Sequence, residues 1–357
     1  YSLYLWHWPL IVFTKLATSE PLTGIEQATI ATAAVGLAIL TWYLIEQPFR
    51  RRGAMAFDRR AIFKVGATGL TALAASAVGL LALDGMPGRF PDNVLAIAAA
   101  QADASPLRDK CHFHGQEKSS YDDTCVIGDE VSPTVVVYGD SHGAEFSAAL
   151  GEIAKSHHAS VRQITASGCP PAAGFSFPGD TRCEHYNAGM VDRLTSLPPA
   201  TIVLATYALI WNREFPDQFW PGIERTIATL RAAGHRVILL GAVPDMPYAA
   251  GIPAAVARWT AKGRDPNEFS FKIGAKEVAA VDARLQSIAI AQGATFVPVS
   301  PELCSEAGCK PYAGGAVLYF DNNHLSMSGA QLMANKLLVP VIWPEPDVSK
   351  LSAAPPN

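Results

Sequence analysis

The chain lacks a charge excess of either sign that would define a partner. Its 28 Lys and Arg residues are offset by 32 Asp and Glu residues, which leaves a net charge of −4 at pH 7. This balance argues against a nucleic-acid-binding protein, which normally presents a strongly basic surface. The sequence also contains no internal repeat and no glycine-rich phosphate-binding loop. Nucleic acid is therefore not an expected partner.

Cysteine is absent from the first 110 residues, and all six cysteines follow. An even set confined to one part of the chain indicates disulfides in an oxidising compartment. Six cysteines allow 15 pairings, of which pairing between sequence neighbours closes short loops and is favoured. Zinc is the rival interpretation for Cys111-His112-Phe113-His114, but this spacing matches no common site, so no metal is expected. The favoured pairs are Cys111 with Cys125, Cys169 with Cys183, and Cys304 with Cys309.

Long apolar runs are confined to the first 83 residues. Ala28–Ile45 and Val65–Leu83 are uncharged, and each approaches the ~20 residues that cross a bilayer as a helix. Tyr1–Thr14 is a shorter, aromatic-rich apolar segment. Buried core helices are the alternative, but the later part of the chain already supplies its own core. Membrane spans are therefore the favoured interpretation.

The distribution of basic residues predicts how these spans are oriented. The loop from Ala17 to Glu26 has neither Lys nor Arg, whereas the connection between the two complete spans is strongly basic. Basic loops stay on the cytoplasmic side, so everything after Asp84 is expected on the outer side. The basic residues of that connection are Arg50, Arg51, Arg52, Arg59, Arg60 and Lys64.

A candidate nucleophile follows a β-branched apolar run. Thr134–Tyr138 leads directly into Gly139-Asp140-Ser141-His142, and Ala144–Ala154 is rich in helix formers. Ser141 is therefore predicted at a strand-to-helix turn, at the carboxyl edge of a parallel sheet where ligands bind. The alternative is that Ser141 is only a helix N-cap and Asp140 a turn former.

A carboxylate and an imidazole lie close together near the other end of the same domain. Asp321 and His324 are three residues apart in Asp-Asn-Asn-His-Leu-Ser, just before a predicted helix over Ser326–Leu338. A serine hydroxyl needs an imidazole to take its proton and a carboxylate to orient that imidazole. Ordinary turn chemistry is the alternative for this segment, but together with Ser141 it indicates acyl transfer.

The remaining pattern predicts an α/β fold with a doubly wound, flavodoxin-like parallel sheet of about five strands. The first strand is followed by helical stretches that alternate with further apolar strands. Right-handed crossovers bring the end of the first strand and the Asp321 loop to the same edge. The further strands are Val161–Ile164, Thr201–Ala205, Arg236–Ala242 and Ala294–Val299, and the helices between the later ones are Gln218–Ala233 and Glu277–Gln292.

These two motifs resemble the first and last blocks of the SGNH (GDSL-like) hydrolase and acyltransferase superfamily, over about residues 132–343. The resemblance implies that Ser141 is the nucleophile, His324 the general base and Asp321 the residue that orients it. It also implies an oxyanion hole made by the Ser141 N–H, Gly168 of the second block and Asn212 near the third. Asn212 does not stand in the usual Gly-x-Asn setting.

The membrane part resembles the last two helices of the membrane acyltransferase-3 family. The resemblance rests on Tyr1-Ser2-Leu3-Tyr4-Leu5-Trp6-His7-Trp8-Pro9-Leu10 and Glu46-Gln47-Pro48-Phe49-Arg50. Some members carry an extra span and a C-terminal SGNH domain, and resemble O-acetyltransferases of lipopolysaccharide O-antigen or other surface polysaccharides. The chain begins in mid-helix, so it is expected to be a fragment whose earlier spans are missing. His7 is not assigned a catalytic role.

The expected organisation has five parts: residues 1–60 as the last two helices of a membrane acyltransferase domain, 61–84 as an additional span, 85–131 as an extension, 132–345 as the SGNH catalytic domain and 346–357 as a flexible tail. The resemblance implies a periplasmic O-acyltransferase of the bacterial inner membrane that acts on a polysaccharide acceptor. It binds no cofactor in this fragment, and acetyl-CoA is the implied donor to the missing membrane part. A carbohydrate O-acetyl esterase and a non-catalytic carbohydrate-binding domain remain the alternatives.

Overall fold

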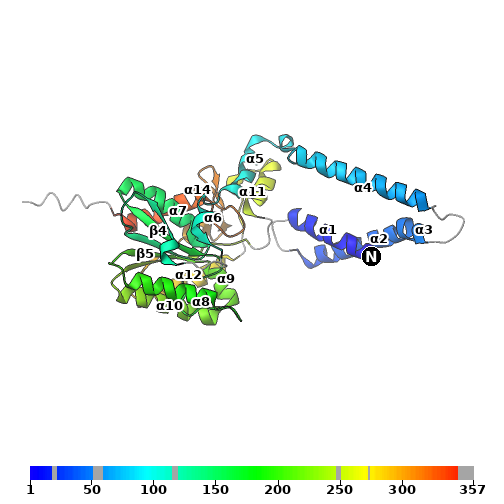
Figure 1. The fold of residues 1–357 in the computed structure, drawn as a ribbon. Helices are drawn as coiled ribbons and strands as arrows, with labels where there is room; N and C mark the ends of the chain where they lie inside the picture. The colour runs from blue at the N-terminus through cyan, green and yellow to red at the C-terminus, as the bar shows by residue number, and fades with distance from the viewer. Residues whose placement is uncertain (18–21, 51–58, 115–119, 247–250, 272–273, 345–357) are drawn as a thin grey trace, which may run out of the picture. The chain divides into compact units, whose positions relative to one another are not determined.

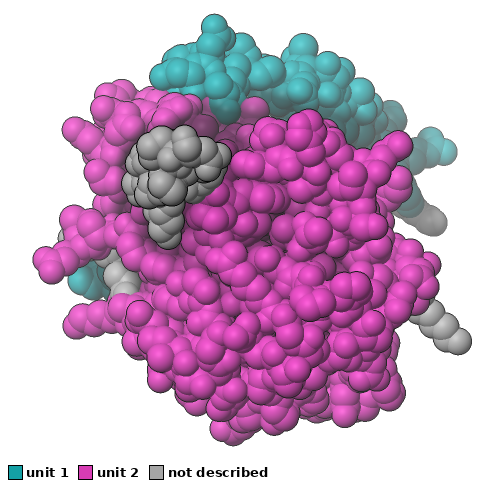
Figure 2. Space-filling model, turned by 90° about the vertical axis from the view of Figure 1, so that its left-hand side faces the viewer, with its two compact units in different colours: residues 1–96, 248–250 teal, residues 97–247, 251–357 magenta. Residues whose placement is uncertain are grey.

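The computed structural model describes residues 1–17, 22–50, 59–114, 120–246, 251–271 and 274–344. The chain divides into two compact units, coloured separately in Figure 2. One comprises residues 1–96 with 248–250, and the other residues 97–247 with 251–357. Arg51 and Arg52 of the basic connection, and the tail predicted from residue 346, lie outside the described residues.

The first unit is helical (Figure 1). Its helices are α1 (Ser2–Ala17), α2 (Gly24–Thr41), which continues through the π-helix η1 (Trp42–Glu46) into α3 (Gln47–Arg50), and α4 (Arg59–Ala82). The segments Gly24–Glu46 and Arg60–Ala82 are long and apolar enough to cross a membrane. A hydrogen bond of 2.8 Å from Trp6 Nε1 to Thr41 Oγ1 joins α1 to α2.

The second unit is built on a mostly parallel sheet, as the alternation of strands and helices predicts. Its central strand β3 (Val135–Gly139) lies between β4 (Ser160–Ala166) and β5 (Thr201–Ala205), and every residue of β3 is buried. The order β4-β3-β5-β6-β7 is the flavodoxin-like 2-1-3-4-5 arrangement. The outer strands on the β5 side are β6 (Arg236–Leu240) and β7 (Thr295–Val297).

Two short strands extend the sheet beyond β4. β1 (His112–Phe113) pairs in parallel with the end of β4, and β2 (Cys125–Gly128) pairs antiparallel with its beginning. Both strands belong to residues 85–131, which the sequence pattern assigns to an extension that precedes the SGNH domain. Runs of two and four residues are too short for a periodicity signal, so neither strand was predicted.

Helices cover both faces of this sheet (Figure 1). α7 (His142–Ala154) and α14 (Met327–Met333) pack together on one face, and α14 continues as the π-helix η7 (Ala334–Leu338) and α15 (Val339–Ile342). The other face carries α8 (Arg182–Thr195), α9 (Ala208–Glu214), α10 (Pro216–Ala232) and α12 (Ala275–Ala291). Shorter elements are α5 (Asp92–Ala99), α6 (Arg108–Cys111), α11 (Ile252–Ala261), α13 (Ser300–Leu303) and the hairpins β8–β9 (Cys304–Ser305, Gly308–Cys309) and β10–β11 (Tyr312–Ala313, Ala316–Val317).

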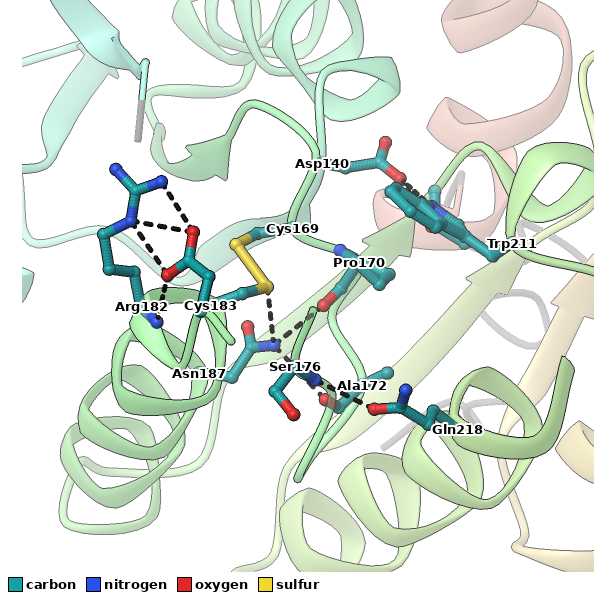
Figure 3. The surroundings of a disulfide bond; sticks show 12 residues. Asp140, Cys169, Pro170, Ala172, Ser176, Arg182, Cys183, Asn187, Trp211 and Gln218 are labelled. Atoms are coloured by element: carbon teal, nitrogen blue, oxygen red, sulfur yellow. Dashed lines mark hydrogen bonds and ion pairs between the residues drawn. A yellow bond between two sulfur atoms is a disulfide. The ribbon is translucent and has the colours of Figure 1, made fainter. Parts of the chain in front are cut away.

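Three disulfides join the sequence-neighbour pairs that the sequence favours. Cys111–Cys125 ties the approach to β1 to β2, and Cys304–Cys309 links β8 to β9. Cys169–Cys183 links the loop after β4 to the first turn of α8, where the buried Asn187 amide donates to the carbonyls of Pro170 and Ala172 at 2.9 and 3.2 Å (Figure 3). The loop that follows β4 is therefore held covalently and by hydrogen bonds.

Gly139, the last residue of β3, occupies a position where only glycine can stand. A Cβ there would lie 1.9 Å from the backbone oxygen of Ala205 on β5. We expect Gly139→Ala to lower the free energy of unfolding by about 3 kcal/mol, because backbone atoms must separate to admit the methyl group. Urea denaturation of the chain in detergent measures the change.

Gly189→Ala is the matched control. Gly189 lies inside α8, and a Cβ there meets nothing within 4 Å. Alanine is expected to stabilise the helix by about 0.5–1 kcal/mol at such a position. Equal effects of the two substitutions would contradict the close approach of β3 to β5.

Candidate active site

Ser141 lies at the sharp turn between β3 and α7, at the carboxyl edge of the sheet. The sheet order reverses between β3 and β5, so this turn stands at the topological switch point where open α/β sheets bind ligands. The turn is closed by the Gly143 N–H, which donates to the Asp140 carbonyl at 3.0 Å. Ser141 is the N-terminal flanking residue of α7, but its hydroxyl makes no side-chain cap. The hydroxyl is thus left for another partner.

That partner is His324. Its Nε2 lies 2.8 Å from Ser141 Oγ, although 183 residues separate the two in sequence. Its Nδ1 lies 2.6 Å from Asp321 Oδ2. The three side chains therefore form a continuous hydrogen-bonded line from carboxylate through imidazole to hydroxyl.

The loop that carries Asp321 and His324 is a closed turn. Asp321 Oδ1 accepts the backbone N–H groups of Asn323 and His324 at 2.9 and 2.7 Å. Tyr319 and Leu325 form a bridge at the base of the turn, and the Phe320 ring stacks on His324 with centroids 5.3 Å apart. Both Asp321 oxygens are thus engaged, one by the loop backbone and one by the imidazole.

This environment sets the protonation of Asp321. Burial raises the pKa of the carboxyl group, but the hydrogen bond and the charge of His324 lower it, together with the backbone N–H groups of Asn323 and His324. The net result is a pKa below the ordinary value of 3.8. Asp321 is therefore an anion at neutral pH, as a carboxylate that orients an imidazole must be.

Asp140 is a structural centre that turn propensity alone does not predict. Its carboxylate is 1% exposed and accepts from the His142 N–H, the Thr206 hydroxyl, the Tyr207 N–H and the Trp211 indole, at 2.7–3.0 Å (Figure 3 shows the Trp211 bond). Burial raises the pKa of this carboxyl group, and the four hydrogen bonds oppose the rise. Asp140 thereby fixes the turn of Ser141 to the loop after β5.

His142, the last residue of the Gly-Asp-Ser-His motif, connects the turn of Ser141 directly to the loop that carries Asp321 and His324. Its ring is 6% exposed, stacks on Tyr207 at a centroid distance of 4.4 Å, and lies 4.7 Å from the His324 ring. Its Nε2 is 3.1 Å from Asn323 Oδ1. Burial, followed by the charge of His324, lowers the pKa of His142 well below 6.5, so the ring is neutral at physiological pH.

The two residues suggested for an oxyanion hole lie in different settings. Gly168, in the turn after β4, has φ +66°, and a Cβ there would meet nothing within 4 Å. Because Gly139 pairs with Thr165, the turns that follow β3 and β4 leave the sheet at the same edge. Asn212 lies on α9, and its Oδ1 accepts a hydrogen bond of 3.2 Å from Trp220 Nε1.

His112 on β1 is a further buried histidine beside this edge. Its ring is 2% exposed, with Nδ1 3.0 Å from Thr165 Oγ1 and Nε2 2.9 Å from Ser167 Oγ. Burial lowers the pKa of His112 to about 3, and the neighbouring charges of Arg108, His114 and His324 act in the same direction. The sequence pattern of this segment suggests zinc as its only alternative role. Within the described ranges, no group of three or more His, Cys, Asp or Glu side chains is placed to hold a metal ion.

A mostly parallel sheet with flanking helices, and this hydrogen-bonded line at its switch point, define the class of SGNH hydrolases and acyltransferases. Such a fold supports an acyl-transfer or esterase enzyme. The family described as "SGNH domain (fused to AT3 domains)" matches residues 110–338, about two thirds of the sequence, and the chain belongs to it.

A solved structure shows the same fold. The periplasmic domain of a lipopolysaccharide acetyltransferase from Salmonella ser. Paratyphi A superposes with a TM-score of 0.51 and 16% identity, over 66% of this chain and 97% of that chain. Weaker likenesses include a GDSL-like lipase from Bacteroides thetaiotaomicron VPI-5482 (TM-score 0.37, 14% identity, 70% and 98% covered) and an acetylxylan esterase from Geobacillus stearothermophilus (0.35, 11%, 61% and 96%). No curated protein matches this chain.

The buried Asp140 carboxylate predicts a specific loss of stability. Asp140→Ala leaves the Thr206 hydroxyl, the Tyr207 N–H and the Trp211 indole without their acceptor, which we expect to cost about 3–5 kcal/mol of unfolding free energy. Asp192→Ala, at an exposed position on α8, is expected to stay within about 0.5 kcal/mol of the parent. Urea titration followed by tryptophan fluorescence compares the two, and a loss for Asp140→Ala as small as that of the control would contradict the assignment.

His112 predicts a pH dependence of stability. Its pKa is about 3 in the folded chain and about 6.5 in the unfolded chain, so the unfolded state binds a proton that the folded state refuses. The stabilisation is complete above pH 6.5 and is lost as the pH falls, at about 1.4 kcal/mol per pH unit. The gap in unfolding free energy between the parent and His112→Gln should therefore narrow between pH 6.5 and 4.5.

The control is His185→Gln, which replaces an exposed histidine on α8. The measurement is urea denaturation at half-unit pH steps. A gap between the parent and His112→Gln that stays constant over this range would show that His112 titrates in the folded chain as it does in the unfolded one.

Proposed function

We propose that this chain belongs to a periplasmic O-acyltransferase that transfers an acyl group, most simply acetyl, through Ser141 to a hydroxyl of a cell-surface polysaccharide such as lipopolysaccharide O-antigen. One observation carries the proposal: the hydrogen-bonded line Asp321–His324–Ser141, at 2.6 and 2.8 Å, at the switch point of the sheet. An imidazole in this position can take the hydroxyl proton while the carboxylate holds its other nitrogen.

In the first half-reaction, Ser141 Oγ attacks the acyl carbonyl carbon and gives its proton to His324 Nε2. The carbonyl oxygen becomes an oxyanion, which we assign to the backbone N–H groups of Ser141 and Gly168. A donor of this kind contributes about 3–4 kcal/mol in measured oxyanion holes. The bond from carbonyl carbon to the leaving group then breaks, and His324 returns the proton to the leaving group. The product is an ester on Ser141.

In the second half-reaction, a sugar hydroxyl replaces the leaving group. His324 takes the proton of that hydroxyl while its oxygen attacks the acyl-serine carbonyl. Collapse of the tetrahedral intermediate breaks the bond to Ser141 Oγ, which recovers its proton from His324. Asp321 accepts the Nδ1–H bond throughout, so it stabilises the imidazolium that forms twice in each cycle.

The donor and the location form a further part of the proposal. The family is described as fused to AT3 domains, and the two long apolar helices support a chain anchored in the bacterial inner membrane. Three disulfides in the second unit support an oxidising compartment such as the periplasm. We propose acetyl-CoA as the cytoplasmic donor, from which the membrane part would deliver the acyl group to Ser141.

Ser141→Ala tests the proposal. We expect loss of polysaccharide O-acetylation to background in cells that carry this variant, because no oxygen remains to hold the acyl group. Ser156→Ala, in an exposed turn after α7, should leave acetylation unchanged. Mass spectrometry of the surface polysaccharide measures both, and full acetylation with Ser141→Ala would refute the assignment.

The same measurement tests the first rival function, and a labelling experiment tests the second. An O-acetyl esterase uses water in place of the sugar, so loss of Ser141 would raise the acetyl content of the glycan. A carbohydrate-binding domain would leave Ser141 of the parent chain unlabelled by a serine-directed phosphonate, which adds its phosphorus to an activated Oγ.

A further inference from the structure

Four polar side chains form a hydrogen-bonded chain that reaches the candidate oxyanion turn from inside the sheet. Gln163 Nε2 lies 2.8 Å from Thr165 Oγ1, Thr165 Oγ1 lies 3.0 Å from His112 Nδ1, and His112 Nε2 lies 2.9 Å from Ser167 Oγ. Gln163 and Thr165 are fully buried and His112 is 2% exposed, whereas Ser167 is half-buried. The chain thus runs from the protein interior to its surface.

Each side chain of this network has few other side-chain partners, although the His112 ring also meets the backbone of Thr165. Within the described part of the molecule, Thr165 Oγ1 has only Gln163 and His112 as side-chain partners, and Ser167 Oγ has only His112. His112 is neutral because burial lowers its pKa to about 3. A neutral imidazole carries one N–H donor and one acceptor nitrogen, so the proton position on one nitrogen determines the role of the other.

The amide of Gln163 determines which atoms donate and which accept along these hydrogen bonds. Its Nε2 donates to Thr165 Oγ1, and its buried Oε1 has no partner among the described residues. Exchanging the two amide atoms would instead leave a buried nitrogen with both protons unpaired, and orphaned N–H groups are rarer in proteins than unpaired carbonyl oxygens. The donation from Gln163 is therefore the favoured arrangement.

The positions of the protons on Thr165, His112 and Ser167 follow from this donation. Since Thr165 Oγ1 already accepts from Gln163, its own proton points to His112 Nδ1. The proton of His112 then resides on Nε2, from which it is donated to Ser167 Oγ. Ser167 Oγ accepts its hydrogen bond from His112, which lies inside the protein. The Ser167 hydroxyl proton is therefore available to an acceptor that is not part of the protein.

Ser167 follows Thr165 by the same two residues by which Ser141 follows Gly139, and Thr165 pairs with Gly139 at the same edge of the sheet. Ser167 immediately precedes Gly168, and its backbone N–H donates to the Phe113 carbonyl at 2.7 Å. Phe113 and His112 form β1, which the Cys111–Cys125 disulfide ties to β2. The side chain of Ser167 is thus fixed by its own backbone and by β1.

We propose that Ser167 is a further catalytic residue, whose hydroxyl donates a hydrogen bond to the acyl oxygen as it becomes negative during attack by Ser141. This inference rests on the proposed acyl transfer. Ser167 would supplement the N–H of Gly168, while Thr165 and His112 are positioning residues that direct its proton outward. The acceptor is an ester-type carbonyl oxygen, and no bond of Ser167 is made or broken.

Kinetics of acyl transfer by the full chain test the donor role. Ser167→Ala is expected to lower kcat by about 100-fold with little change in KM, because the lost bond forms only with the developing charge. Ser156→Ala should leave both constants unchanged. Equal kcat for Ser167→Ala and the parent would overturn the proposal, as would a loss confined to KM.

A double-mutant cycle tests the relay. Thr165→Val removes the hydroxyl that orients His112 and is expected to lower kcat about 10-fold in the parent chain. In the Ser167→Ala background the same substitution should have no further effect on kcat, because it acts only through Ser167. An undiminished loss in that background would mean that Thr165 supports the fold and would overturn the relay.

The tautomer of His112 can be read without any turnover. Long-range 1H–15N spectra of the resting chain should show the ring proton on Nε2 and a bare Nδ1 between pH 5 and 8. A proton on Nδ1 would reverse the direction of the hydrogen bonds from Gln163 to Ser167 and turn the Ser167 hydroxyl inward. That result would overturn the proposal. Because Ser141→Ala tests the acyl-enzyme separately, transfer that survives that substitution would defeat the proposed function, whereas the His112 spectrum judges the relay independently.

Discussion

The site depends on one buried carboxylate. Asp140 joins the turn after β3 to the loop after β5 by accepting four hydrogen bonds, and it does so at the point where the sheet order reverses. A buried carboxyl group is tolerated only when such donors surround it. By holding Asp140, the same donors fix the position of the neighbouring Ser141 at the edge of the sheet. From that position, its hydroxyl can meet an imidazole that arrives from the far end of the chain.

A second set of constraints determines where that imidazole stands. The backbone N–H of Met246 donates to the carbonyl of Asn322, and that of Ile252 donates to the carbonyl of Asp321. The loop after β6 and the start of α11 therefore support the Asp321–His324 loop from outside. Within this loop the Asp321 carboxylate accepts the His324 N–H, and His142 links the loop to the turn that carries Ser141. Rigid supports of this kind matter because proton transfer to an imidazole depends on sub-ångström placement.

Much of this arrangement could be predicted from short stretches of sequence. The valines of β3 predict a buried strand, and the Gly-Asp-Ser-His turn follows it directly. Right-handed crossovers predict that the end of this strand and the Asp321 loop lie at the same edge of the sheet. The doubly wound fold is confirmed, and the cysteines pair as their spacing favours. The roles of Ser141, His324 and Asp321 stay proposals, although the structure brings their side chains into one line. Asp140, His112 and His142 could not be assigned, because their partners lie about 50–180 residues away. The sequence pattern also does not indicate the helix Ala208–Glu214, on which Asn212 lies.

The two short strands beside β4 have an effect that reaches beyond the site. Without β1 and β2, the seven-residue β4 would be the border of the sheet, with a row of unpaired amide and carbonyl groups. A long bare border can recruit a strand from another molecule. Here one border is capped by pieces of two and four residues and the other ends in the three-residue β7. Neither offers a template of useful length, so the sheet is protected against pairing with a strand of another molecule.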